Sequence, residues 1–397
     1  MTGAQRSRSI TPRASPGLIW LIAFACGAMV ANIYYAQTLI AAIGKEIGLS
    51  PGLSGTVTTL TQFGYGLGLL LIVPLGDLLE NRRLTLTMLA GTCFGCLGIA
   101  LSRGPLTFLL ASIVTGVCAT GAQVLLPLAS HLTPPERQGR TIGQIMSGLL
   151  AGIMLARPLA SFMAETLGWR SVFFFSAGLM ALIAIALRVT LPCRVRPPQE
   201  GYREIVLSMA TLARQHRRLR LRALYQGLLF TSFNIFWTAA PLLLLQNFHF
   251  TQNQVGLFAL VGAGGALAAP LAGTLADRGQ TRLTTILAHA LIIVCFALTG
   301  VLVANRMLIA FAATAFLIDA AVQLNQITGQ KIIFDISSEA RSRVNSIYLT
   351  TMFVLGATGS LIGSATFESG GWTLSAATGA ALGSVSLLAF FIWDRTA

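Results

Sequence analysis

Charged side chains are scarce in this sequence. Asp, Glu, Lys and Arg together make up 10% of its 397 residues, whereas 54% are hydrophobic. A soluble domain carries about 25% charged residues, because its surface must be hydrated. This composition excludes an ordinary water-soluble fold and leaves lipid as the solvent. Because one helix needs about 20 apolar residues to cross a bilayer, the chain is long enough for about twelve spans.

Patterns for catalysis and for nucleotide or metal binding are missing. The sequence contains no G-x-x-x-x-G-K-[ST] motif, so it lacks the loop with which many proteins bind ATP. Its four histidines are scattered, and Cys93 and Cys96 stand in an apolar segment without further ligand-forming residues nearby. We therefore expect no enzyme activity, no cofactor and no metal. We also expect no cleavable signal peptide, because the first apolar run is too long for one.

Long apolar segments alternate with short polar ones along the whole chain. They predict twelve membrane spans, near residues 17–41, 53–76, 84–102, 106–131, 140–164, 170–191, 223–247, 252–276, 283–303, 307–330, 343–367 and 372–393. The predicted domains are an N-terminal tail (1–16), a first bundle (17–191), a central loop (192–222), a second bundle (223–393) and a C-terminal tail (394–397).

Basic residues lie mainly in every second gap between the spans. If the N-terminus is cytoplasmic, all but five of the 27 Lys and Arg residues fall on that side, and the five are Lys45, Arg103, Arg157, Arg170 and Arg306. Short loops rich in Lys and Arg stay in the cytoplasm during membrane insertion. We therefore predict that both tails and the central loop are cytoplasmic. The net charge of +14 follows from this topology and does not indicate a nucleic-acid-binding surface.

The two halves of the sequence repeat each other at an offset of about 200 residues. The matching pairs are Asn32 and Asn234, Gly55 and Gly256, Asp77 and Asp277, Gln123 and Gln326, and Arg140 and Arg343. Six spans repeated in the same orientation predict two bundles related by an axis along the membrane normal. The predicted fold class is an all-α membrane protein, with twelve transmembrane helices in two pseudo-symmetric six-helix bundles.

A charged loop occurs at the same place in both halves. The second copy reads GTLADRGQTR and contains Gly273, Asp277 and Arg278; the first reads PLGDLLENRR and contains Asp77, Arg82 and Arg83. Both resemble the loop motif G-x-L-A-D-R-x-G-R-R of the major facilitator superfamily, and the second copy is the closer one. An Asp at a helix end with Arg one turn later can pair with a neighbouring helix in one conformation and release it in another. The resemblance implies that these loops act as a conformational switch.

Further segments resemble the bacterial sugar and drug exporters of this superfamily. They are ANIYYAQTL in the first span, PPERQGRTIGQIMSGLLAGIMLAR leading into the fifth, and GWRSVF opening the sixth. The resemblance covers residues 17–393 and implies alternating access between the halves. It is incomplete, because Ser112 stands where such exporters carry a proton-coupling Arg, and the fifth span lacks a Gly before Pro158. Any proton coupling must then use other residues.

Asp319 lies in the middle of the tenth predicted span. It is about 17 Å from either end of that span at 1.5 Å per residue, where a carboxylate is costly unless it is paired, hydrated or protonated. Gln323, Gln326 and Gln330 follow on the same helix face. We expect this polar stripe to line a central cavity, where Asp319 carries the coupling proton or binds a substrate. The alternative is a structural hydrogen bond between helices.

Arg157 lies within the fifth span, about 10 Å from its outer end. Its guanidinium stays charged at any relevant pH, so it needs an anion, a dipole or water. One interpretation pairs it with Asp319 as a gate between the halves; the other pairs it with a group of its own bundle.

Other polar side chains within the spans are candidates to line the substrate cavity. Amides and aromatic rings of this kind suit a neutral polar or amphipathic substrate better than a polyanion, although each of them also serves to hold helices together. The predicted residues are Asn32, Tyr35, Gln37, Gln62, Tyr65, Gln123, Asn234 and Trp237, together with Gln323 and Gln326.

The predicted function is secondary active transport, with proton-coupled export of small polar or amphipathic compounds such as sugars, drugs or metabolites. The alternatives are an uptake symporter or uniporter of the same fold, and a receptor or scaffold that does not transport. A receptor would be expected to carry an added soluble domain, whereas only residues 394–397 follow Trp393. The expected partners are a small-molecule substrate, protons and the lipid bilayer. We expect a monomer in a bacterial inner membrane.

Overall fold

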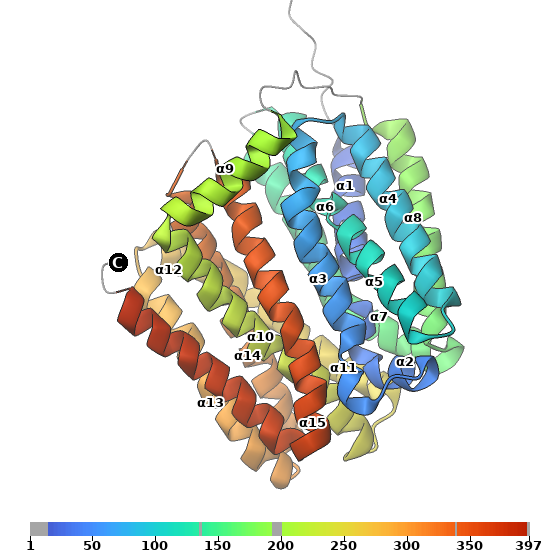
Figure 1. Cartoon of the computed structure of the whole chain (residues 1–397), viewed down its shortest axis with the longest axis vertical. Helices are drawn as coiled ribbons and strands as arrows, with labels where there is room; N and C mark the ends of the chain where they lie inside the picture. Colours follow the sequence, from blue (N-terminus) through green and yellow to red (C-terminus); the bar gives the residue numbers. More distant parts are fainter. Residues whose placement is uncertain (1–14, 135–136, 193–200, 338–339, 395–397) are drawn as a thin grey trace, which may run out of the picture.

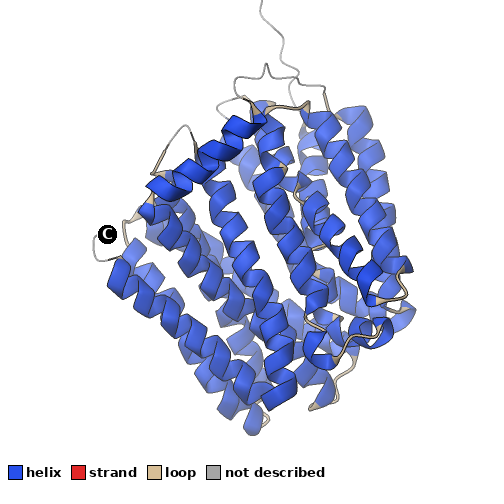
Figure 2. Cartoon of the chain, viewed as in Figure 1, coloured by secondary structure: helices blue, strands red, loops and turns tan. Residues whose placement is uncertain are grey.

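Helices make up most of the computed structural model, which describes residues 15–134, 137–192, 201–337 and 340–394 (Figures 1 and 2). No strand occurs within these ranges. Most residues of the two predicted tails lie outside them. The observed architecture confirms an all-α membrane protein of two six-helix bundles.

Six membrane-crossing segments form the first bundle. They are α1 (Pro16–Ala31), α3 (Thr56–Leu71), α4 (Asn81–Leu101), the consecutive helices α5 (Pro105–Ala119) and α6 (Gly121–His131), α7 (Gln138–Leu167) and α8 (Trp169–Thr190). The connection from α1 to α3 contains η1 (Tyr35–Thr38), α2 (Ile40–Ile47) and η2 (Pro51–Leu53), and η3 (Val73–Asp77) follows α3.

The second bundle repeats this arrangement. Its segments are α10 (Arg217–Gln246), the series α11 (Gln252–Ala263), η5 (Gly264–Ala268) and α12 (Ala269–Asp277), then α13 (Thr281–Ala304), α14 (Leu308–Phe334) and the two parts of α15 (Arg341–Trp393). Non-helical backbone at Gly370 and Gly371 divides α15 into its two spans. Gly371 has a φ of +61°, which favours a residue without a Cβ, so the chain reverses direction there.

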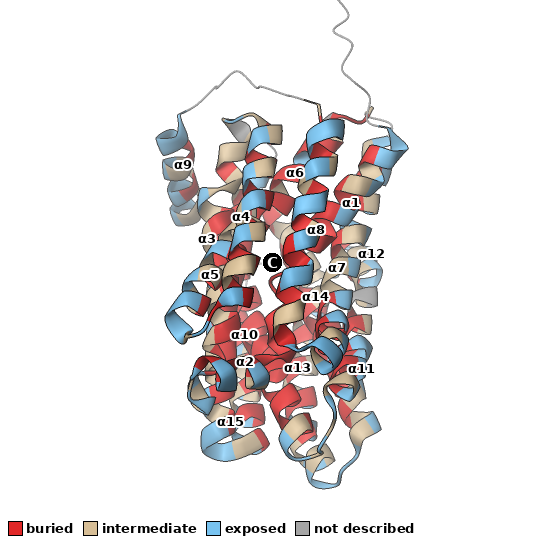
Figure 3. Cartoon of the chain, turned by 90° about the vertical axis from the view of Figure 1, so that its right-hand side faces the viewer, coloured by how far each residue is buried: buried red, intermediate tan, exposed pale blue. Residues whose placement is uncertain are grey.

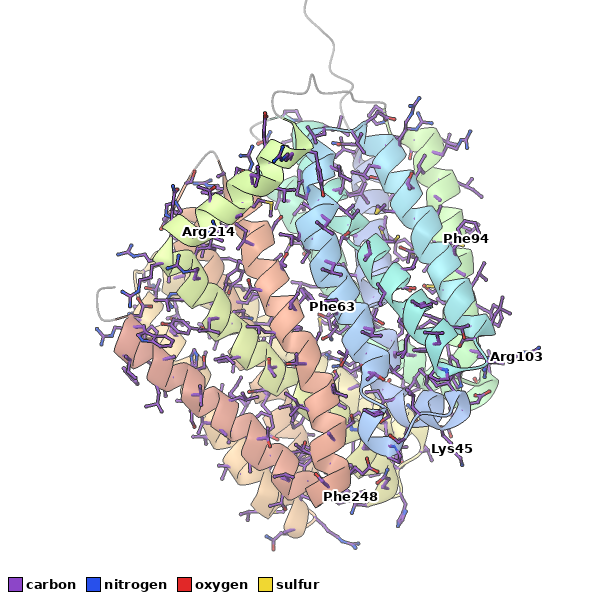
Figure 4. The ribbon with its side chains drawn as sticks, in the orientation of Figure 1. Lys45, Phe63, Phe94, Arg103, Arg214 and Phe248 are labelled. Atoms are coloured by element: carbon purple, nitrogen blue, oxygen red, sulfur yellow. The ribbon has the colours of Figure 1, made fainter. Side chains whose placement is uncertain are left out.

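The surface of the molecule carries many large apolar side chains, as contact with lipid requires. Eight helices in the described ranges, with α5 and α6 counted as one and α15 as one, are long and apolar enough to cross a membrane. Phe94 is 72% exposed and Ile309 is 90% exposed. Figure 4 shows Phe94 and Phe63 on the outside of the ribbon. A soluble protein rarely exposes such a belt.

The two bundles meet at one end of the molecule more closely than at the other. We call the end where α1 begins and α15 ends the terminal face, and the other end the opposite face; Lys45 and Arg103 lie at the opposite face (Figure 4). Toward this face α3 packs on α15, and α7 packs on α11. At the terminal face, α9 (Tyr202–Gln215) extends from the first bundle to the second (Figure 1).

Helix α10 is the most deeply buried of the candidate membrane spans. In its apolar window 89% of the residues are buried, compared with 33–50% for the other candidate spans. Figure 3 shows buried residues concentrated along it. Because lipid cannot reach α10, polar side chains along this helix must find partners inside the protein.

Two details differ from the predicted segments. The first span ends as a regular helix at Ala31, ten residues before the predicted limit, because the side chain of Asn32 donates to the carbonyl oxygens of Ala28 and Met29 at 2.9 and 3.3 Å and caps the helix. The central segment contains α9, whose amphipathic pattern places Ile205 and Met209 in the interior.

Close packing of α3 on α5 depends on Gly116. A Cβ there would lie 2.9 Å from the backbone nitrogen of Tyr65 and would overlap the carbonyl oxygen of Thr61. We expect Gly116→Ala to lower the melting temperature in detergent, with a cost of about 1–3 kcal/mol typical of overpacking. Gly178→Ala is the control, because the space around this exposed helical glycine is open. Equal melting temperatures for the two variants would contradict this account of the packing.

Candidate functional site

Two opposite charges from different bundles meet in the interior. Arg157 of α7 places Nη1 3.8 Å from Oδ2 of Asp319 on α14. Both residues are buried, at 2% and 8% exposure. The nearest described carboxylate to this guanidinium therefore belongs to the opposite bundle, so the contact exists only while the bundles are together at this level.

Aromatic rings complete the surroundings of both charges. Trp237 of α10 donates a hydrogen bond from Nε1 to Oδ1 of Asp319 at 2.7 Å. The guanidinium carbon of Arg157 lies 4.2 Å from the centre of the Trp237 ring, 5.2 Å from that of Phe233 and 5.3 Å from that of Tyr34. Such contacts stabilise a cation from which water is excluded. Nη2 of Arg157 has no hydrogen-bond partner among the described residues, so its two N–H groups remain available at this site.

Glycines of the eighth span make room for Trp237 and Asp319. A Cβ at Gly265 would lie 2.5 Å from Cβ of Asp319 and 2.6 Å from the backbone nitrogen of Ala320. A Cβ at Gly262 would overlap the Trp237 ring. The glycine-rich sequence around η5 therefore lets the backbone lie directly against both side chains, as small residues do where membrane helices approach closely.

Side-chain amides continue the polar contacts away from the ion pair. Nε of Arg157 donates to Oε1 of Gln37 at 2.9 Å, and Nε2 of Gln37 donates to Oδ1 of Asn234 at 2.9 Å. Asn234 and Gln62 exchange two hydrogen bonds, at 2.9 and 3.1 Å. Gln37 and Gln62 belong to the first bundle and Asn234 to the second. Three predicted cavity residues thus meet between the bundles and connect to the charges.

Neutral hydrogen bonds close the opposite face beyond the ion pair. Nε2 of Gln252 on α11 donates to the carbonyl oxygen of Thr38 at 2.8 Å and to Oγ of Ser161 at 3.3 Å. On the other side of the interface, the backbone nitrogen of Gly55 donates to Oγ of Ser364 at 3.1 Å. Both contacts join one bundle to the other, so this end must separate before anything can reach the ion pair from this side.

The remaining predicted cavity residues lie elsewhere in the interior. Asn32 accepts from Oγ of Ser176 at 2.6 Å and from Sγ of Cys96 at 3.1 Å, so its contacts stay within the first bundle. Nε2 of Gln123 donates to the hydroxyl of Tyr65 at 3.2 Å, which is a second pair within that bundle. Tyr35 is also buried.

The polar stripe of α14 extends from Asp319 toward the terminal face. Gln323 and Gln326 are half-buried, and Nε2 of Gln330 donates to Oδ1 of Asn345 at 3.1 Å. The stripe is therefore neither in open solvent nor fully enclosed.

The two charged loops differ in their contacts. In the second copy, the ammonium of Lys331 on α14 pairs with Asp277 at the end of α12; Arg278 caps this helix, and Gly273 lies within it. In the first copy, Arg82 donates to the carbonyl oxygen of Arg188, and Nε of Arg83 lies 3.4 Å from Oε2 of Glu80. The side chain of Asp77 is outside the described part of the structure.

Several contact residues could not be selected from the sequence. Thr38 and Ser161 are common small polar residues of membrane helices, and nothing in their spacing distinguishes them. Gln252 follows Thr251, which caps α11, so its sequence context indicates only a helix start. Lys331 directly follows Gln330 at the end of the polar stripe, but its partner Asp277 is 54 residues away in the sequence.

Comparison with known proteins agrees with this architecture. A sequence model of the Major Facilitator Superfamily matches residues 19–225 and again 222–397. The uncharacterized transporter YgaY of Escherichia coli O157:H7 is 38% identical over 96% of both chains. The purine ribonucleoside efflux pump NepI of Escherichia coli O6:K15:H31 is 22% identical over 47% of this chain and 48% of its own. The crystal structure of the nucleoside transporter NupG superposes with a TM-score of 0.74 at 12% identity, covering 94% of this chain and 99% of that one. The chain belongs to the Major Facilitator Superfamily of transporters.

Proposed function

We propose that this protein is a proton-coupled exporter of small polar or amphipathic compounds that works by alternating access. Membership of a transporter family gives the general activity. The direction of transport is supported by the resemblance to NepI, whose name describes an efflux pump. The neutral amides around Asn234 favour an uncharged polar substrate. The named substrates of NepI and NupG make nucleosides the first compounds to test.

We also propose that the protein is a monomer in a bacterial inner membrane, with both termini in the cytoplasm. The distribution of Lys and Arg supports this orientation, and the bacterial relatives support the membrane. The terminal face is then cytoplasmic and the opposite face periplasmic. Because the bundles are joined at the opposite face, the structure corresponds to the state that faces inward.

The observation that carries the coupling proposal is the buried contact between Arg157 and Asp319 across the two bundles. The cation stabilises the ionised carboxylate only while the bundles are closed at this level. When they separate, Asp319 loses this partner and takes up a proton from the periplasm. When they close again, the returning guanidinium favours release of the proton to the cytoplasm. One carboxylate thereby carries a proton inward for each cycle.

Asp319→Asn tests this role. The amide keeps an acceptor for Trp237 but cannot bind or release a proton. We expect the variant to bind substrate and to lose substrate-driven proton flux, measured in proteoliposomes with an internal pH-sensitive dye and a panel of nucleosides, sugars and amphipathic cations. Arg103→Gln, which changes an exposed charge at the opposite face, is the control. Normal coupling in the Asp319 variant would assign the proton to another residue, and transport without protons would favour a uniporter.

The pair of Asp277 and Lys331 tests the proposed switch loop. Because both side chains are exposed to solvent, the pair is weak, and either single reversal, Asp277→Lys or Lys331→Asp, should change the initial exchange rate by no more than about fivefold. The double reversal should restore the rate, since it restores the attraction. Rates are measured in the same vesicles, and melting temperatures should stay unchanged. If the double reversal is no better than the single ones, attraction between these two charges does not control the switch.

A further inference from the structure

Gln62 and Asn234 form two reciprocal hydrogen bonds across the two bundles. Nδ2 of Asn234 donates to Oε1 of Gln62 at 2.9 Å, and Nε2 of Gln62 donates back to Oδ1 of Asn234 at 3.1 Å. Each amide thus presents one donor beside one acceptor to its partner. This is the hydrogen-bonding arrangement by which a side-chain amide reads the edge of a nucleobase.

The position of Asn234 is fixed by its own bundle. Its Nδ2 also donates to the carbonyl oxygen of Gly356 at 3.0 Å. A Cβ at Gly359 would lie 2.9 Å from Cβ of Asn234, so α15 is pressed against α10 at this point. On the other side, Gln62 lies on α3 and is fully buried. The pair therefore joins two rigid elements.

Separation of the bundles must break this pair. A buried amide without hydrogen-bond partners is destabilising, so each of the two groups then needs a new donor and acceptor. Water can supply both in the open state. A substrate with the same arrangement can do so while the site is still closed to water.

Each amide has an aromatic ring three residues further along the same helix. Tyr65 follows Gln62 on α3, and Trp237 follows Asn234 on α10, so ring and amide share one face of each helix. The Tyr65 ring in turn contacts that of Phe353, with centres 4.7 Å apart. Aromatic faces beside a donor–acceptor edge suit a flat heterocycle. Sugar hydroxyls, which rotate freely, do not require this fixed geometry.

We propose that Gln62 recognises substrates through a ring that carries an N–H donor next to a C=O acceptor, the lactam edge found in nucleobases such as hypoxanthine, and that this ring takes the place of Asn234. This assignment rests on the proposed transport function and names the substrate class of that site. The ring N–H donates to Oε1 of Gln62 and the ring carbonyl accepts from Nε2, as Asn234 does in the structure. The substrate thereby replaces Asn234 as the partner of Gln62 and breaks a contact between the bundles.

A second buried amide pair in the chain provides a matched control. Nδ2 of Asn325 on α14 donates to Oε1 of Gln226 on α10 at 2.7 Å, and both residues are buried. This pair lies wholly within the second bundle. Gln226→Met and Gln62→Met each remove a buried side-chain amide. Only Gln62→Met removes a contact between the bundles.

The test is equilibrium binding of tritiated inosine to the purified full-length protein in detergent, with competition by unlabelled inosine, 1-methylinosine and ribose. Methylation at N1 removes the ring donor and leaves the sugar unchanged. We expect unlabelled inosine to compete at a concentration about tenfold or more lower than 1-methylinosine, because loss of the ring donor in a buried site also leaves the acceptor of Gln62 unpaired. Ribose should compete weakly. Gln62→Met should bind both nucleosides equally weakly, whereas Gln226→Met should keep the preference.

Equal competition by inosine and 1-methylinosine, competition by ribose as strong as by inosine, or no inosine binding would each overturn the proposal. The comparison of the two nucleosides on the wild-type protein decides the matter even if Gln62→Met does not fold. Binding in detergent needs no proton gradient, so a protein that prefers inosine but moves no protons would refute the coupling mechanism alone. A protein that transports another compound with protons and ignores inosine would refute the lactam assignment alone.

Discussion

The permanent charge of Arg157 is the constraint on which the interior depends. A guanidinium cannot lose its proton at any relevant pH. Within a membrane-spanning bundle it therefore needs an anion nearby and hydrogen-bond acceptors for its N–H groups. The anion is Asp319, which lies on the other bundle, and the acceptor at Nε is Gln37 of its own. This buried charge therefore has both its anion and its acceptor at Nε only when both bundles contribute. The charge is therefore stabilised when the opposite face closes, because closure brings Asp319 to Arg157.

Many of the contacts between the bundles are hydrogen bonds made by small polar and amide side chains. Lipid tails are as apolar as leucine side chains, so an apolar surface gives little reason for two bundles to associate in a membrane. Here the interface uses the amides of Gln37, Gln62 and Asn234, with a hydroxyl at Ser364 and a further amide at Gln252. Each hydrogen bond contributes only about 0.5–1.5 kcal/mol, so the interface can be exchanged for water or a substrate without a large barrier. Such an interface is suited to opening repeatedly.

Much of the fold could be predicted from the sequence, because spans are long apolar segments and the repeat relates one half to the other. The fold class and the superfamily are confirmed. The charges at Arg157 and Asp319 were also visible, since each interrupts an apolar run. Their contact was one of two interpretations that the sequence left open, because hydropathy gives depth in the membrane but not which helices are neighbours. The hydrogen bond between Gln37 and Asn234 joins residues that are 197 positions apart. The helix end at Asn32 was missed for a related reason, since its cap is made by a side chain within an apolar segment.

The same ion pair has an electrical consequence. With Asp319 ionised, the pair carries no net charge, and a neutral substrate adds none. With Asp319 protonated, Arg157 leaves the site with one positive charge. A membrane potential acts on a full elementary charge crossing the membrane with about 2.3 kcal/mol per 100 mV, and on a smaller displacement in proportion. In the proposed cycle, a potential that is negative inside therefore assists the return of the protonated protein and leaves the substrate-loaded step nearly unaffected. The membrane potential and the proton gradient then both drive the return of the protonated protein. The potential acts on the charge of Arg157, which stays the same throughout the cycle.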